Sequence, residues 1–411
     1  MPDPARIERR LEELWTIAQG TGGGADRPAY SAAEADAMLR VAGWAVELGL
    51  EPGIDAYGNL WALPGWGPSG SRPVVTAGSH VDTVPDGGRY DGALGTVLGL
   101  ELVADLADRP TGGVRAGLLV CAAEEAPRFG AGTMGSRLLI GTLRLEALAE
   151  LHDADGISAA EALSGYLADL DGLPRVDPPI ERLRAHAEVH VAQRRALREL
   201  GVVTTVASPR RFAVQIDGEA GHSGEVSMNE RHDALAAAAE VVLAVEAAAR
   251  AEPRETVATV GTLAVTPGAL SVVPGQARLG IDVRGIDSAS LARVDAAIRA
   301  AVSEIAQRRG VGADMELVRG GEPVRLDPEL AAAALTAAAR LGIPATETWS
   351  GAGHDAQHLS ALVPALLLFV PLHGGESHTP QERAEMDEIV QAASVMSSVL
   401  GGRALDTDVE V

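Results

Sequence analysis

The sequence of 411 residues contains no lysine, so all 34 of its basic side chains are arginines, set against 57 aspartates and glutamates. The formal net charge at pH 7 is therefore -23. Proteins that bind nucleic acids or anionic membranes use clustered positive charge, and this chain has no long basic block. We expect a small molecule as its ligand, and neither a nucleic acid nor a membrane as its partner.

Cysteine and aromatic residues are also scarce. Cys121 is the only cysteine, which excludes an intrachain disulfide and permits a reducing compartment. Aromatic residues make up 3% of the chain, so we expect an aliphatic core. The first residues lack the apolar run of a signal peptide, and the most hydrophobic long stretch, 234–249, is interrupted by Glu240 and Glu246. We therefore expect a soluble, cytoplasmic protein.

The length of the chain and the order of its predicted elements indicate two domains. Helices and strands alternate up to about residue 205 and again after about residue 320, as in an α/β domain. The later part is expected to contain a helix at 328–341, a strand at 364–370 and a helix at 381–400. The middle part is expected to contain strands at 211–217, 256–265, 277–284 and 313–318 and helices at 230–250 and 288–308.

The β-α-β-β-α-β order of the middle part matches the ferredoxin-like unit. We therefore expect an α/β catalytic domain formed by residues 1–208 and 320–411, interrupted by an inserted domain at 209–319.

Two short segments with candidate metal ligands follow an apolar, strand-like run at 73–77. They contain His80 with Asp82, and then Asp91. An aspartate two residues from a histidine can hold the second ring nitrogen and so select the tautomer that binds a metal. Taken alone, His80 and Asp82 are more typical of a surface or capping pair. Asp91 by itself fits a cap for a helix that starts near Ala93.

A second apolar run, 117–123, ends in the pair Glu124 and Glu125. Two adjacent carboxylates after a buried strand are costly unless a cation or protons compensate their charge. A metal ligand next to a general base satisfies this condition. The alternative is a pair of solvated loop glutamates.

Two histidines complete the candidate set. His190 ends a strand-like run that starts at Ala187, and His378 follows the apolar run 366–370. Together with the residues above they give two three-ligand groups that share one carboxylate, the pattern of a two-metal hydrolase. Imidazole with carboxylate suits zinc, manganese, cobalt or nickel. The candidate ligands are His80, Asp91, Glu125, His190 and His378.

Several ordered motifs resemble one enzyme family. The chain is similar, from about Tyr30 to about Leu400, to the hydantoinase/carbamoylase-type amidases of the aminoacylase/carboxypeptidase superfamily, which include N-carbamoyl-L-amino-acid amidohydrolases, allantoate amidohydrolases and bacterial β-ureidopropionases. The motifs that carry this resemblance lie at 55–60, 78–100, 124–141, 218–228, 259–284, 351–356 and 375–382.

The resemblance implies a role for each candidate residue. His80, Asp91 and His190 would hold one divalent ion, and Asp91, Glu125 and His378 a second, with zinc or manganese favoured over cobalt or nickel. Glu124 would be the general base, and Asp82 a further catalytic residue beside His80. The resemblance also implies that His222, in the inserted lid domain, polarises the scissile carbonyl in the partner subunit of a homodimer.

The substrate pocket departs from the family pattern. The resemblance implies substrate contacts at Gln193, Arg284, Ser271 and His222, with Arg284 suited to a carboxylate. The family's His-x-Glu-Gln-Gly reads His190-Val191-Ala192-Gln193-Arg194 here. Ser271 replaces an asparagine, Glu225-Val226-Ser227 replaces Thr-Thr-Pro, and Ala126 with Pro127 follows the paired glutamates where a glycine is usual.

Three functions therefore remain open. The first is hydrolysis of a linear C–N bond in an N-carbamoyl amino acid, allantoate or related ureido compound that bears a carboxylate. The second is a dipeptidase or N-acyl-amino-acid deacylase of the same superfamily. The third is a binding protein without activity, against which stands the retention of every ligand and base position.

Overall fold

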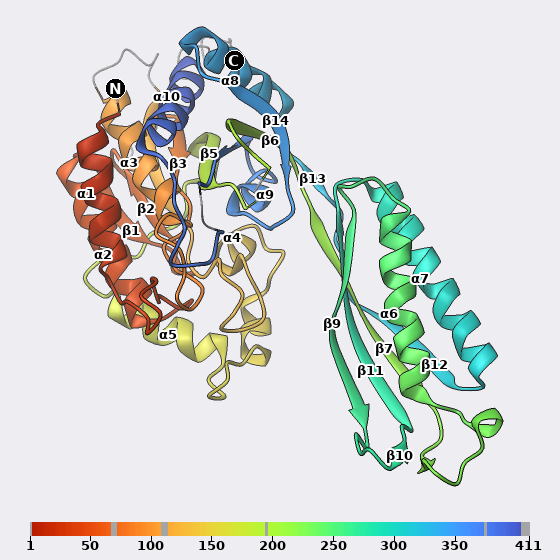
Figure 1. Ribbon diagram of the computed structural model, residues 1–411. Helices are drawn as coiled ribbons and strands as arrows, with labels where there is room; N and C mark the ends of the chain where they lie inside the picture. The colour runs from red at the N-terminus through yellow and green to blue at the C-terminus, as the bar shows by residue number, and fades with distance from the viewer. Residues whose placement is uncertain (1, 67–71, 108–113, 194–195, 374–375, 404–411) are drawn as a thin grey trace. The chain divides into compact units, whose positions relative to one another are not determined.

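The computed structural model describes residues 2–66, 72–107, 114–193, 196–373 and 376–403, and it divides into two compact units (Figure 1). The first unit comprises Met1–Thr204 and Arg325–Val411, and the second comprises Thr205–Val324. In the described part of the chain, no helix has both the length and the hydropathy needed to cross a membrane.

A nine-stranded mixed sheet forms the centre of the first unit. Its four central strands, in the order β4-β3-β5-β15, run parallel, while β2 and β6 add to them in the antiparallel direction. These central strands are almost entirely buried, as expected for a parallel sheet covered on both faces. The strands are β1 (Glu51–Ile54), β2 (Leu60–Leu63), β3 (Val74–Ala77), β4 (Arg115–Val120), β5 (Leu183–Val191), β6 (Leu200–Val206), β13 (Val324–Arg325), β14 (Ala345–Ser350) and β15 (Ala365–Val370).

Helices cover this sheet and share an aliphatic core with it (Figure 1). All but one of the residues of α3 are buried, which explains why that helix is apolar all round. Its one buried glutamate, Glu101, is paired with Arg6 and Arg10 of α1. The helices are α1 (Pro4–Trp15), α2 (Ala32–Glu47), α3 (Ala93–Leu106), α4 (Met134–Leu139), α5 (Ala159–Asp169), α8 (Pro328–Leu341), α9 (Asp355–Leu359) and α10 (Met386–Arg403).

The second unit has the ferredoxin-like arrangement predicted from the sequence. Its four strands form an antiparallel sheet in the order β12-β7-β11-β9, and α6 and α7 share a hydrophobic core with that sheet. The elements are β7 (Ser208–Asp217), α6 (Ala234–Arg250), β9 (Val257–Thr266), β11 (Gln276–Gly285), α7 (Ser288–Arg309) and β12 (Gly312–Arg319), with a separate two-stranded antiparallel sheet of β8 (Gly221–His222) and β10 (Val272–Val273).

Two helices begin later than the sequence pattern predicted. The helix expected from Glu230 begins at Ala234, because the side chain of Asp233 accepts a hydrogen bond from the Ala236 N–H and caps it. The helix expected from Gln381 begins at Met386, so the segment before it belongs to a loop.

Candidate metal centre

The candidate ligands gather at one edge of the central sheet. His80 follows β3 and pairs with Cys121, Glu125 follows β4, and His190 lies near the end of β5. Because β4, β3 and β5 are adjacent and parallel, their carboxyl ends meet at one edge, where open α/β sheets place their chemistry. Asp91 lies just before α3, and His378 lies in the loop after β15.

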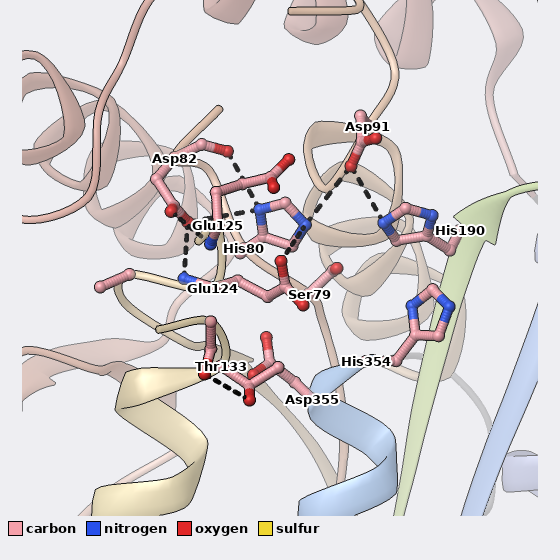
Figure 2. Close-up of polar contacts among 12 residues, drawn as sticks. Ser79, His80, Asp82, Asp91, Glu124, Glu125, Thr133, His190, His354 and Asp355 are labelled. Atoms are coloured by element: carbon pink, nitrogen blue, oxygen red, sulfur yellow. Dashed lines mark hydrogen bonds and ion pairs between the residues drawn. The ribbon is translucent and has the colours of Figure 1, made fainter. Parts of the chain in front are cut away.

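The first ligand group consists of His80, Asp91 and His190, and all three residues are buried. The Oδ1 atom of Asp91 lies 3.1 Å from Nε2 of His190 and 3.5 Å from Nε2 of His80. Figure 2 shows both imidazole rings turned toward this carboxylate. The group therefore presents two ring nitrogens and one carboxylate oxygen within a space that one ion can occupy.

The second ligand group uses the other oxygen of the same carboxylate. The Nε2 atom of His378 lies 3.2 Å from Oδ2 of Asp91 and 3.5 Å from Oε1 of Glu125. The His378 side chain is 44% exposed, whereas Asp91 and Glu125 are buried. Asp91 thus belongs to both groups, with one oxygen directed to each.

The buried histidines are held in the orientation that metal binding needs. Nδ1 of His80 lies 3.0 Å from the Asp82 carbonyl oxygen, and Nδ1 of His190 lies 3.1 Å from the Val191 carbonyl oxygen. A ring Nδ1–H that donates to a carbonyl leaves Nε2 as the free acceptor. The His80 ring packs against the backbone of Gly92, where a larger residue would not fit, because a Cβ at that position would be 2.4 Å from Cε1 of the ring.

The paired glutamates are fixed through their backbone. The Asp82 carboxylate accepts hydrogen bonds from the N–H groups of Glu124 (3.0 Å) and Glu125 (2.8 Å), as Figure 2 shows. The carboxylate of Glu34 on α2 accepts from the preceding N–H, that of Ala123 (2.9 Å). The carboxylates of Asp82 and Glu34 therefore fix the backbone of three successive residues, 123–125. Asp82 contacts both the glutamates and His80.

The simpler local interpretations of these residues are wrong. The Asp91 side chain does not cap α3, because the N-cap residue of that helix is Gly92 and, among the described residues, no side-chain hydrogen bond caps it. His80 and Asp82 do not form a surface pair, because both are buried. The glutamates are not solvated loop residues, since Glu125 is 7% exposed and the Glu124 side chain 13% exposed.

The electrostatics of the site indicate an excess of negative charge. Burial, and then the Asp91 carboxylate, raise the pKa of Glu125 to about 7. Burial raises the pKa of Glu124 well above its usual value, and Glu125 adds to this shift. The hydrogen bond to Asp91 raises the pKa of His378 to about 9. Carboxylates crowded in this way favour protons or a cation.

The residues present fit two divalent ions. The Oε1 atom of Glu125 is buried and makes no hydrogen bond in the described part of the chain, although buried polar atoms are rarely left without a partner. Each group offers imidazole together with carboxylate, which suits transition-metal ions such as zinc or manganese. Because Asp91 belongs to both groups, it would help to hold both ions close together, as two-metal hydrolysis needs.

A third cluster was not predicted from the sequence. Glu188, His190 and His354 are buried and close together. The rings of His190 and His354 pack edge to face, with their centroids 4.7 Å apart. Glu188 already accepts hydrogen bonds from Ser79 (2.7 Å) and from the Ala356 N–H (2.8 Å), so it braces the ligand loops. Side chains alternate between the two faces of a strand, so Glu188 and His190 on β5 point to the same face. This spacing is the sequence signal that could have placed Glu188 beside the candidate ligands.

A cavity of about 820 Å³ adjoins the second ligand group. Glu125 and Thr83 form one part of its wall, and α5 forms another through Ala162 and Tyr166. Its size is in the range of small-molecule sites.

The expected substrate contacts fall in both units. Gln193 is partly buried after β5, next to the buried Ala192, and Arg194 lies outside the described residues. In the second unit, His222 on β8 is exposed and pairs with Val272, and the Ser223 N–H donates to the Ser271 carbonyl (2.9 Å). His222 and Ser271 are therefore neighbours.

Arg284 lies at the opposite end of the second unit. It is near the end of β11, whereas His222 on β8 and Ser271 beside β10 lie before the start of that strand. Figure 1 shows β10 at that end of the sheet. At ~3.3 Å per residue, Gln276 and Arg284 are roughly 26 Å apart. The Arg284 guanidinium bonds to Asp282 at 2.8 Å.

The three residues 225–227, which differ from the family pattern, lie in the loop that follows His222. The Glu225 and Val226 N–H groups both donate to the His222 carbonyl oxygen, and Ser227 precedes a short 3₁₀ helix.

Comparison with known proteins identifies the family. The pattern of Peptidase family M20/M25/M40 matches residues 76–401. The N-carbamoyl-L-amino acid amidohydrolase of Geobacillus stearothermophilus is 35% identical over 95% of this chain and 96% of its own. A crystal structure of an amidase of the hydantoinase/carbamoylase family from Burkholderia multivorans is 32% identical, covers 98% of each chain and superposes with a TM-score of 0.85.

The chain belongs to the hydantoinase/carbamoylase amidase family, within Peptidase family M20/M25/M40. This confirms the resemblance inferred from the motifs, and the chain is an amidohydrolase of this family. The allantoate amidohydrolase of Bacillus subtilis, 31% identical over 95% of both chains, is another similar amidohydrolase. Di-metal hydrolysis is the chemistry of this superfamily, and each of the two ligand groups around Asp91 could hold one ion.

Proposed function

We propose that this amidohydrolase cleaves a linear amide bond in an N-carbamoyl amino acid, allantoate or a related ureido compound. The observation that carries the proposal is the position of Asp91, whose two oxygens face two separate ligand groups beside Glu124. The names of its relatives, which act on N-carbamoyl amino acids and allantoate, support this substrate class.

Glu124 is the proposed general base. Its Oε2 lies 3.9 Å from Nε2 of His80, so the carboxylate faces the first ligand group. Two divalent ions, most simply zinc or manganese with cobalt and nickel as alternatives, would acidify the attacking water and polarise the scissile carbonyl. Glu124 takes a proton from that water while the water oxygen forms a bond to the carbonyl carbon. It then delivers the proton to the leaving nitrogen as the C–N bond breaks. Asp82 keeps Glu124 in place through the backbone.

His222 is the proposed donor to the carbonyl oxygen of the substrate. The Gly224 N–H donates to Nδ1 of His222 (3.1 Å), so the ring hydrogen sits on Nε2 and is available to an acceptor. Such a donor stabilises the negative charge that develops on the carbonyl oxygen.

The proposed substrate contacts are Arg284, Ser271 and Gln193. The Arg284 guanidinium, which now bonds to Asp282, would bind a carboxylate of the substrate in place of that aspartate. A small substrate cannot span the roughly 26 Å between Arg284 and the His222 end of the unit, a distance that follows from ~3.3 Å per residue. One chain therefore cannot offer both ends of this unit to the same substrate. We propose, as the family resemblance implies, that His222 with Ser271 beside it serves the site of a partner subunit, with the inserted unit as lid and dimerisation domain of a homodimer.

A substrate panel tests this function. The protein would be freed of metal, reloaded separately with zinc, manganese, cobalt or nickel, and incubated with N-carbamoyl amino acids, allantoate, N-acyl amino acids and dipeptides. Release of ammonia or free amino acid from the carbamoyl and ureido compounds is expected. Turnover of only the acyl or dipeptide substrates would instead indicate the deacylase or dipeptidase, and no turnover of any would favour the binding protein.

A further inference from the structure

Two neighbouring side chains of the loop that follows β15 contact the Asp91 carboxylate. The hydroxyl of Ser377 donates to Oδ2 of Asp91 at 2.8 Å, and Nε2 of His378 lies 3.2 Å from the same oxygen. His378 adopts a left-handed backbone conformation (φ 66°), which few residues other than glycine adopt without support from their surroundings. The relative position of this loop and Asp91 therefore decides whether the two ligand groups can share one carboxylate.

Glu382 joins the loop to the backbone of Asp91. Its Oε2 atom accepts hydrogen bonds from the N–H groups of Tyr90 (2.7 Å) and Asp91 (3.1 Å). Glu382 is buried, and its carboxylate lies so close to Gly88 that a Cβ there would be 2.2 Å from Oε2. One side chain thus holds the backbone on which the bridging carboxylate is mounted, four residues after His378.

A carboxylate is a costly choice for a purely structural role at this position. It is buried near a second carboxylate, that of Asp91, and its Oε1 atom makes no hydrogen bond among the described residues. A neutral acceptor would satisfy the same two N–H groups without repulsion between charges. The repulsion between the Glu382 and Asp91 carboxylates is offset in the metal-loaded protein, because the positive charge of the ions compensates both of them.

We infer that Glu382 is a positioning residue of the metal centre, which sets Asp91 so that its two oxygens reach both ligand groups. The inference rests on the proposed two-metal site. Partners that orient metal ligands typically change metal affinity about 10–100-fold when they are removed. The effect is expected in both ligand groups, because both depend on Asp91.

Three substitutions separate positioning from charge and from general stability. Glu382→Gln removes the charge but keeps an oxygen acceptor at the same reach. Glu382→Met removes the acceptor at similar side-chain length, and Glu382→Asp keeps the charge but shortens the reach. Glu385→Met, at an exposed glutamate of the same segment, is the matched control.

The measurement is titration of the metal-free full-length protein with zinc and with manganese by calorimetry, with the metal-free unfolding temperature recorded for each variant. Glu382→Met and Glu382→Asp are expected to weaken metal binding about 10–100-fold. Glu382→Gln should lose less than either, because it gives up the charge but keeps an acceptor at the same reach, and Glu385→Met should stay close to wild type. Should Glu382→Met fail to fold, the comparison of Glu382→Asp with Glu382→Gln still decides the outcome.

Two results would overturn the inference. Wild-type affinity in both Glu382→Met and Glu382→Asp would show that the contact serves only the fold. A loss in Glu382→Gln as large as in Glu382→Met would show that charge matters and reach does not. Because the readout is metal binding, a wrong substrate assignment leaves this result unaffected, whereas a wild-type protein that binds no metal would overturn the metal centre and the inference together.

Discussion

The Oδ2 atom of Asp91 lies 3.2 Å from Nε2 of His378, although the two residues come from opposite parts of the chain. This contact completes the second ligand group, in which His378 supplies the one imidazole. The buried first group contains two imidazoles and does not use His378. The two groups are therefore separable by mutation.

The first prediction concerns metal content. Purified protein reloaded with zinc or manganese should hold close to two ions per chain, and His378→Ala should lose at least one of them because its group then has no imidazole. Elemental analysis after dialysis measures this. His373→Ala is the control, since His373 lies in the same loop but pairs with Glu388 at 2.7 Å. Absence of metal from the reloaded wild type would refute the site.

The second prediction concerns the general base. Glu124→Gln keeps the shape of the side chain but removes the proton acceptor, so turnover should fall by roughly two to four orders of magnitude, as is usual for a lost general base. Metal content should barely change. Glu125→Gln provides the comparison, because it should lose metal. If Glu124→Gln lost metal while Glu125→Gln kept it, the two roles would have to be exchanged.

The third prediction concerns the dimer. If His222 serves the partner subunit, Glu124→Gln and His222→Ala homodimers are each inactive, but a mixed dimer has one site with both residues intact. Random exchange between equal amounts should restore up to about a quarter of wild-type activity, because half of the dimers are mixed and half of their sites are complete. Mixed dimers that form, as shown by differential tagging, but remain inactive would argue against a role in trans.

The fourth prediction concerns the pH dependence of stability. His186 on β5 is buried with Nδ1 3.0 Å from the Thr76 hydroxyl, and burial lowers its pKa to about 3. In the unfolded chain a histidine has a pKa of about 6.5, so below that pH only the unfolded state takes up the proton. The free energy of unfolding is therefore reduced as the pH falls from about 6.5 toward 3, by about 2 kcal/mol at pH 5.

The variant His186→Asn retains a polar atom near the position of Nδ1 but does not titrate. It should be less stable than wild type at pH 7.5, because it is smaller than the ring that it replaces. That deficit should narrow by up to about 2 kcal/mol at pH 5, since only the wild type carries the penalty. Urea unfolding at the two pH values measures the difference. His152→Asn, at an exposed histidine, is the control and should show no such change; a constant deficit for His186→Asn would contradict the prediction.

The sequence by itself determined the family and the order of the elements. The period-2 and period-3.6 patterns of apolar residues are local, so they revealed the ferredoxin-like order of the inserted unit before any contact was known. The motifs around His80, Glu124 and His378 are likewise short and continuous. Helix starts were less accurate, because the cap at Asp233 depends on one side-chain hydrogen bond that apolar periodicity does not contain.

The tertiary structure decided the meaning of individual residues. In the sequence, Asp91 next to Gly92 suits a helix cap as well as a metal ligand. Only the parallel pairing of β3 and β5 brings His80 and His190 to one oxygen of Asp91, and only the loop after β15 brings His378 to the other. A local pattern cannot specify such a meeting point, because it depends on which strands are neighbours.

The same reason explains the supporting residues that the sequence did not reveal. Glu34, Glu188 and Glu382 are ordinary glutamates within their own segments, and their roles come from N–H or hydroxyl donors far away in the chain. Their burial is what distinguishes them, since a buried carboxylate requires compensating partners. Burial is a property of the folded chain. The candidate ligands could therefore be named from the sequence, whereas the residues that orient them became visible only in the tertiary structure.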